Sequence, residues 1–130
     1  MKVPYTGATV VFILAISSAQ AAVSQDDFLI RTTGNLVNLC AADATDPLYA
    51  PAIYFCQAFG AGVFQTQQLY QAASGGKPLY CMPAPLPTRN EAMNAFVTWA
   101  KATPAVTDIV PAAGVMQYLM KTYPCLTKNR

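Results

Sequence analysis

The chain has 130 residues, which is room for one domain of ordinary size. Charged side chains make up 11% of it and hydrophobic ones 54%, whereas an average soluble domain is roughly 25% charged. The formal net charge is only +2 and the basic residues are scattered, which excludes the clustered positive charge typical of a nucleic-acid-binding protein.

Part of the hydrophobic excess lies at the start of the chain. A short positively charged beginning precedes an unbroken apolar run over residues 8–16, and Ala19-Gln20-Ala21 has the A-x-A pattern of a signal-peptide cleavage site. The apolar run is shorter than the roughly 20 residues that a membrane-spanning helix needs. We therefore expect a signal peptide over residues 1–21, a single domain over residues 22–130, a periplasmic location and no membrane attachment after cleavage.

Four cysteines follow the predicted signal peptide, at spacings of 16, 25 and 44 residues: Cys40, Cys56, Cys81 and Cys125. An even number of cysteines in an exported chain predicts two disulfides. A zinc site is disfavoured because the chain has no histidine and no C-x-x-C motif. Three connectivities are possible from the sequence alone.

Two helices are predicted in the first half of the chain. Residues 22–27 are polar and predict a flexible lead-in. The helix that follows is expected to be firm from Thr33 or Asn35 onward, with Thr33 able to cap it, and to end at Cys40. Asp46-Pro47 is a strong start signal for a second helix that runs to about Ala73. Steps of three and four residues give this helix an inward stripe of Ala52, Phe55, Cys56, Phe59, Val63, Thr66 and Tyr70.

Small residues from Ala58 to Gly62 interrupt the second helix. Each of the two glycines, Gly60 and Gly62, costs about 1 kcal/mol relative to alanine in a helix interior. Such a cost predicts a close approach at this point. Another helix of the same fold is the ordinary explanation, and a ligand or a second subunit is the alternative.

Two further helices are predicted after the glycine-rich turn at 75–76. Residues 79–87 carry three prolines and predict an extended connector tied down by Cys81, although a P-x-P segment could also be a ligand for an aromatic groove. Thr88 and Glu91 form a capping box for a third helix that closes near Lys101. Asp108 can cap a fourth helix that runs to about Tyr123, with an inward stripe of Ala112, Val115, Met116 and Leu119.

These elements predict an all-α fold, a small disulfide-stapled bundle of about four helices. Antiparallel packing of the two helical hairpins allows the pairs Cys40–Cys56 and Cys81–Cys125, which we favour. The nested pairing, Cys40–Cys125 with Cys56–Cys81, is also reachable.

Catalytic residues are scarce. The chain has no histidine for a general base, and its only glutamate, Glu91, is used in the capping box. Asp46 and Asp108 are interpreted as helix caps, and no two carboxylates share a helix face as a glycosidase dyad would require. We therefore expect no enzymatic activity, no cofactor and no metal.

Short motifs around the four cysteines resemble a known family. They are Leu36-x-x-Leu39-Cys40, Phe55-Cys56 followed by Gly62, Tyr80-Cys81-Met82-Pro83, Phe96-Val97-x-Trp99 and Tyr123-Pro124-Cys125. Together they resemble the Rap/Tai family of periplasmic immunity proteins of type VI secretion systems, over about Thr32 to Cys125. The resemblance implies an often homodimeric helical protein that binds a secreted peptidoglycan amidase and occludes its active-site cleft.

Two other functions compete with immunity. One is a periplasmic stress chaperone of the acid-resistance type, although five aspartates, one glutamate and no histidine make a poor pH switch. The other is an envelope interaction protein without a toxin partner. For any protein partner, we expect contacts from the aromatic residues that lie off the inward stripes, because aromatic side chains are enriched at interfaces. These are Tyr49, Tyr54, Phe64 and Tyr118.

Overall fold

A computed structural model describes residues 22–125, so the predicted signal peptide lies outside the described residues. Within this range the chain forms four α-helices and two short 3-10 helices and contains no strand, which confirms the all-α prediction. In chain order the elements are η1 (Gln25–Leu29), α1 (Thr33–Cys40), α2 (Tyr49–Ser74), α3 (Arg89–Lys101), η2 (Pro104–Val106) and α4 (Pro111–Thr122).

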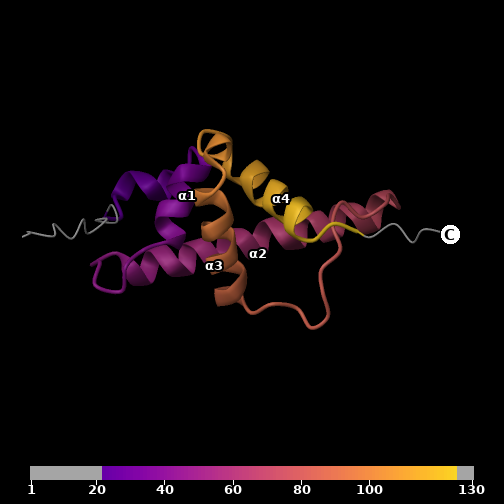
Figure 1. Ribbon diagram of the computed structural model, residues 1–130, viewed down its shortest axis with the longest axis horizontal. Coiled ribbons are helices and arrows are strands. Elements are labelled where there is room, and N and C mark those ends of the chain that lie inside the picture. The colour runs from indigo at the N-terminus through magenta and orange to yellow at the C-terminus, as the bar shows by residue number, and fades with distance from the viewer. Residues whose placement is uncertain (1–21, 126–130) are drawn as a thin grey trace, which may run out of the picture.

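Helix α2 is the longest element, and α1, α3 and α4 all pack against it (Figure 1). Its 26 residues span about 39 Å at 1.5 Å per residue, twice the length of α3 or α4. Its last turns extend beyond the shorter helices, and Tyr70 is 68% exposed there. The inward stripe predicted for α2 is therefore correct at Ala52 and Cys56, which are buried, and wrong at Thr66 and Tyr70, which are exposed.

Both disulfides have the favoured pairing. Cys40, the last residue of α1, is bonded to Cys56 on α2, with their Cα atoms 5.2 Å apart. Cys81 is bonded to Cys125, with their Cα atoms 4.8 Å apart, and the Cys81 amide also donates a hydrogen bond to the Tyr123 carbonyl. The second bridge therefore fastens the segment that follows α4 to the start of the connector between α2 and α3.

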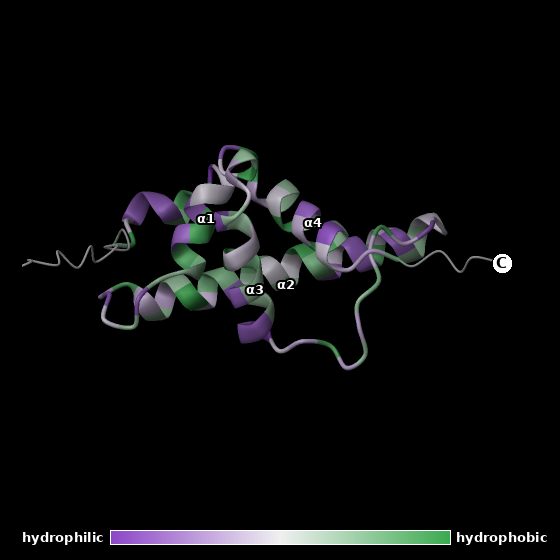
Figure 2. Ribbon diagram, viewed as in Figure 1, coloured by the Kyte–Doolittle hydropathy of each residue, from purple (hydrophilic) through white to green (hydrophobic). Residues whose placement is uncertain are grey.

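Residues 22–27 are ordered against the fold, so the prediction of a flexible lead-in was wrong. Val23 is buried with Leu39 and Ala52 in a small apolar cluster, and its amide donates a hydrogen bond to the Asp46 carboxylate. Asp27 is only 4% exposed. Polar composition predicted flexibility, but a single valine and two aspartates used as hydrogen-bond acceptors hold the segment in place. Figure 2 shows hydrophilic residues in η1 and in the first turn of α3.

The helix starts agree with the sequence signals to different degrees. The Thr88–Glu91 capping box is present, with the Thr88 amide 2.7 Å from a Glu91 carboxylate oxygen. Helix α1 is capped by Thr32 rather than Thr33, because Asn35 completes a capping box with the earlier threonine. Asp46 accepts a hydrogen bond from the Leu48 amide in a turn, and the helix begins at Tyr49.

The start and face of α4 also differ from the prediction. Its N-cap is Val110 and not Asp108. The buried face includes Gly114, Val115 and Tyr118, whereas Ala112 is exposed. A Cβ atom added at Gly114 would lie 2.4 Å from the Thr33 hydroxyl oxygen, so this glycine is what lets α4 approach α1 so closely. Tyr118, four residues after Gly114, lies on the same inward face of α4.

The close approach predicted at Gly60 and Gly62 is not made within the fold. A Cβ atom added at either position would meet no atom of the described residues within 4 Å. The prediction was wrong in this respect because α4 approaches α1, at Gly114, instead of the middle of α2. The alternative explanations, a ligand or a second subunit, remain open for this stretch.

Candidate interaction surface and cavity

Two of the four aromatic residues predicted to contact a partner lie at the surface. Tyr54 is 72% exposed and Tyr49 is 38% exposed, both in the first two turns of α2. They are held on a rigid helix that the Cys40–Cys56 bridge anchors two residues after Tyr54. This end of α2 therefore presents two tyrosines whose rings are free to contact another protein.

The other two predicted contact residues are used inside the fold. Tyr118 is only 3% exposed, and its ring packs edge-on against Phe96 with centroids 5.7 Å apart. The premise that Tyr118 lies off the inward stripe was wrong, because Tyr118 shares the buried face of α4 with Gly114, which packs against Thr33 of α1. Phe64 is half-buried and lies 6.2 Å from the Tyr80 ring.

Sequence reasoning missed an exposed apolar pair at the other end of α2. Leu69 is 73% exposed and Tyr70 is 68% exposed. The predicted stripe placed Tyr70 inward because the hydrophobic periodicity continues to the end of α2. The helices that pack against α2 end earlier and leave this part of it uncovered. The four glutamines between residues 65 and 71 were a signal that this segment is surrounded by solvent.

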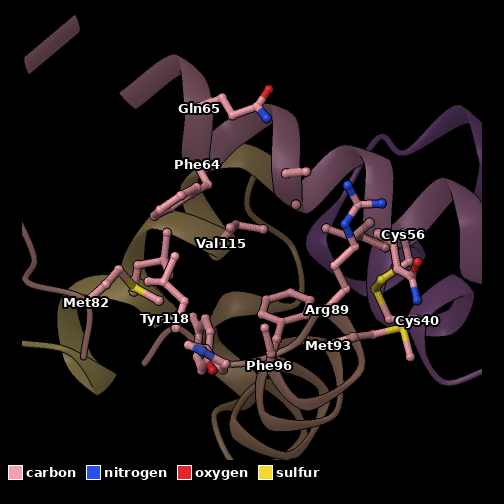
Figure 3. A pocket seen from close by; sticks show the side chains of 18 residues that line it. Cys40, Cys56, Phe64, Gln65, Met82, Arg89, Met93, Phe96, Val115 and Tyr118 are labelled. Atoms are coloured by element: carbon pink, nitrogen blue, oxygen red, sulfur yellow. A yellow bond between two sulfur atoms is a disulfide. The ribbon is translucent and has the colours of Figure 1, made fainter. Parts of the chain in front are cut away.

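A cavity of about 330 Å³ lies between the middle of α2, α3, α4 and the connector (Figure 3). Its wall includes deeply buried side chains, among them Leu36 and Phe96, so it extends from the surface into the core. Gly60 and Ala61 form the α2 side of the cavity, and Met82 and Leu86 contribute from the connector. The polar residues of the lining are Gln57, Gln65 and Arg89.

A second, shallower groove runs along the opposite side of α2, toward α4. It is lined by Phe59, Gly62, Val63, Thr66, Gln67, Ala112 and Met116 and has a volume of about 500 Å³. Gly62 therefore opens onto this groove, as Gly60 opens onto the cavity. Both glycines of α2 face space that the described residues leave unfilled.

Asp27 and Glu91 have perturbed pKa values because their carboxylates accept hydrogen bonds that hold local structure in place. Burial raises the pKa of Asp27, but hydrogen bonds from Ser24, Asn35 and Asn38 outweigh it and bring the pKa below its ordinary value. The Glu91 pKa is lowered by hydrogen bonds from the backbone and side chain of Thr88. In both residues the carboxylate is committed to orienting a helix start, which leaves it a poor general base.

Two tyrosines are held neutral. Burial raises the pKa of Tyr118 well above its usual range, and the hydrogen bond with the Tyr123 hydroxyl raises it further. Burial also raises the pKa of Tyr80, whose hydroxyl has no hydrogen-bond partner among the described residues. Neither phenol is suited to act as a proton donor or acceptor at neutral pH.

Residues 22–125 contain no group of three or more cysteine, aspartate or glutamate side chains placed to hold a metal ion. None of the helices in this range is long and apolar enough to cross a membrane. What the described surface does offer is exposed aromatic and aliphatic side chains at both ends of α2, one deep cavity and one groove.

The sequence model of the Rap1a immunity proteins matches residues 32–125. The chain belongs to this family. No curated protein and no solved structure matches the chain. Membership in the Rap1a immunity proteins implies immunity to a secreted effector.

The Rap1a match coincides with the structural framework of the chain. It begins at Thr32, the N-cap of α1, and ends at Cys125, the last cysteine of the second disulfide. It therefore includes all four α-helices and both bridges, whereas η1 and the buried Val23 lie before it. The resemblance inferred from the cysteine motifs is confirmed over the same range.

Proposed function

We propose that this protein binds a peptidoglycan amidase secreted by a type VI system and blocks it in the periplasm. The observation that carries the proposal is the Rap1a match over the whole helical framework. Two disulfides support a periplasmic location, because such bonds persist in an oxidising compartment. The proposal includes cleavage of a signal peptide after Ala21, which releases a single domain over residues 22–130.

The contact with the toxin is proposed to use Tyr49 and Tyr54. Both tyrosines lie on one rigid helix next to a disulfide, so little conformational entropy is lost when they are buried by a partner. Phe64 lies further along the same helix, in the wall of the cavity. Tyr118 has no part in this contact because it is buried in the core.

The direct test is co-expression with a candidate amidase that is directed to the periplasm. Lysis should occur with the amidase alone and should be suppressed by this protein, and the two purified proteins should elute as one complex in size-exclusion chromatography. Tyr54→Ala should weaken the complex by about tenfold or more, as interface tyrosines often do. Gln117→Ala, which truncates an exposed side chain on α4, is the control for loss of helix surface.

The outcome of the lysis assay decides the proposal for each amidase tested. Cells that lyse equally well with and without this protein would exclude immunity to that amidase. A version that lacks residues 1–21 should stay in the cytoplasm and give no protection, although the same polypeptide should bind the amidase in vitro once oxidised. Protection by that version would contradict the periplasmic site of action.

Homodimerisation is the second part of the proposal. The groove at Gly62 lies between α2 and α4, and the exposed pair Leu69 and Tyr70 follows it along α2, so a second copy would cover both. Light scattering after size exclusion should give twice the chain mass. Leu69→Asp should shift the mass to that of a monomer, and Tyr54→Asp should not.

A further inference from the structure

The cavity described above is larger than ordinary packing defects in a protein interior. Native cores leave few voids bigger than a water molecule, whereas this one has a volume of about 330 Å³, within the range of small-molecule sites. Its wall includes Leu36 and Tyr118, which are 1% and 3% exposed. The space therefore opens from the surface into the centre of the bundle.

A glycine keeps the α2 side of the cavity open. Gly60 lies in the middle of a 26-residue helix, where glycine is less favourable than alanine. No atom of the described residues lies within 4 Å of a Cβ atom added there, so the fold itself does not require a glycine at this position. Any larger side chain would instead project into the cavity.

One cation lies at the cavity. Figure 3 shows Arg89 reaching from the start of α3 toward α2 along the edge of the lining. The Arg89 side chain is exposed to solvent at this edge. The nearby Glu91 carboxylate accepts hydrogen bonds from the amide and hydroxyl of Thr88, at 2.7 and 2.8 Å, and is not part of the lining. The Gln57 amide is engaged with Asn90, at 2.8 Å.

These features define the chemistry of the occupant. A deep apolar space suits a slender hydrocarbon chain, and a single exposed guanidinium at its edge suits one carboxylate, which arginine binds with two parallel hydrogen bonds. We propose that the cavity binds a free medium-chain fatty acid, with its chain among Leu36, Phe96 and Leu119 and its carboxylate on Arg89. This ligand site is independent of the immunity function proposed above.

Trp99 provides a direct reporter for binding. It is the only tryptophan of the chain, and its ring lies 5.8 Å from that of Tyr118 and 6.4 Å from that of Phe96, which both line the cavity. The purified, oxidised protein is titrated with sodium decanoate below its micelle-forming concentration, and with 1-decanol as the uncharged comparison. We expect saturable binding of one decanoate per chain, seen in Trp99 fluorescence and in calorimetry, and about tenfold weaker binding of decanol.

Three variants separate the cavity from the rest of the surface. Gly60→Leu fills the cavity and should weaken decanoate binding at least tenfold. Ala58→Leu adds the same side chain on the exposed side of α2 and should leave the affinity within twofold of the wild type. Arg89→Gln should reduce decanoate affinity about tenfold and leave decanol affinity unchanged, because only the charged head loses its partner.

The proposal is overturned if the wild-type protein shows no saturable decanoate binding. It is equally overturned if Gly60→Leu binds as the wild type does, or if Arg89→Gln weakens decanoate and decanol to the same extent. Circular dichroism and thermal unfolding confirm that each variant is folded. Should Gly60→Leu not fold, Ala61→Leu fills the same wall from the next residue and takes its place in the comparison.

Discussion

At the scale of single residues, the glycine at position 114 sets how closely two helices approach. Added at Gly114, a Cβ atom would lie 2.4 Å from the Thr33 hydroxyl oxygen and 2.6 Å from its methyl carbon. Thr33 is completely buried and its hydroxyl donates a hydrogen bond to the Ile109 carbonyl, so it cannot move aside cheaply. The packing of α4 on α1 therefore depends on the absence of one methyl group.

Gly114→Ala is expected to destabilise the protein by about 1–3 kcal/mol, because overpacking forces the two helices apart. Urea unfolding followed by circular dichroism measures the change. The matched control is Gly62→Ala, another helical glycine with open space around it, which should stabilise the fold by about 0.5–1 kcal/mol. Equal effects of the two substitutions would contradict the packing described for α4.

Asp27 is a second residue with a large local role. Its carboxylate accepts hydrogen bonds from Ser24, Asn35 and Asn38 and so joins η1 to α1. These bonds lower its pKa in the folded state below the unfolded value of about 3.9. A group with a depressed folded pKa contributes stability above its unfolded pKa and loses it as the pH falls through the folded value.

The stability of the wild type should therefore decrease as the pH falls below about 4, and the decrease should be shallower in Asp27→Asn. At pH 7 this variant should be less stable by about 1–3 kcal/mol, since an amide cannot accept all of these hydrogen bonds. Asp26→Asn, an exposed neighbour, should change the stability by less than about 0.5 kcal/mol. Chemical unfolding at several pH values tests the prediction; parallel pH profiles for the wild type and Asp27→Asn would contradict it.

Local signals predicted local structure well and packing less well. The Thr88–Glu91 capping box was predictable because all of its partners lie within four residues. The burial of Tyr118 was not, because both possible stripes of α4 have helical spacing and the choice between them depends on the contact of Gly114 with Thr33, 81 positions earlier in the sequence. The hydrogen bond from the Val23 amide to the Asp46 carboxylate could not be predicted for the same reason, because the two residues lie 23 positions apart in the sequence.

At the scale of elements, α1 starts against a loop. The amides of Thr33 and Gly34 donate hydrogen bonds to the carbonyls of Ile109 and Thr107, at 2.8 and 2.9 Å. The first turn of a helix has amides without partners inside the helix, and here the loop before α4 supplies them. An eight-residue helix, which would be marginal alone, is thereby fixed at its start by this loop and at its end by the Cys40–Cys56 bridge.

Thr33→Val tests this attachment with almost no change in volume. It removes the hydroxyl that donates to the Ile109 carbonyl at 3.0 Å, and we expect a loss of about 1–2 kcal/mol in the free energy of unfolding. Thr98→Val removes an exposed hydroxyl that bonds only within α3, and should cost less than about 0.5 kcal/mol. Hydrogen exchange should also show faster exchange of the α1 amides in Thr33→Val. Unchanged stability and exchange would argue that the loop does not hold the helix.

The lengths of elements were easier to predict than their overlap. The 26 residues of α2 follow from a long periodic pattern closed by the glycines at 75 and 76, and its end at Ser74 is within one residue of the prediction. How much of that helix its neighbours cover depends on where α3 and α4 cross it, which no local pattern encodes. For the same reason the cavity and the exposed pair Leu69 and Tyr70 became evident only in the structure.

At the scale of the whole molecule, the two disulfides are a major source of stability. They close loops of 16 and 44 residues, which the chain-entropy estimate values at about 3 and about 4 kcal/mol. A domain of this size has a total stability of about 5–15 kcal/mol. Much of what keeps this bundle folded is therefore covalent.

Removal of either bridge should lower the urea midpoint, and the larger loss is expected for the Cys81–Cys125 pair. The Cys81→Ser/Cys125→Ser and Cys40→Ser/Cys56→Ser proteins provide the comparison, and the oxidised wild type without reductant is the common reference. A wild-type protein with the same midpoint in the presence and absence of reductant would contradict the prediction.

The extension of α2 beyond the shorter helices has a consequence for the stoichiometry of the proposed complex. Tyr54 and Tyr70 are separated by 16 helical residues, or about 24 Å along one rigid rod. A toxin bound at the first position and a second copy of the chain bound near the other would not compete for the same surface. The proposed contacts are therefore compatible with a two-to-two assembly, in which a toxin that offers two linked copies of its target would be held by avidity rather than by a single contact.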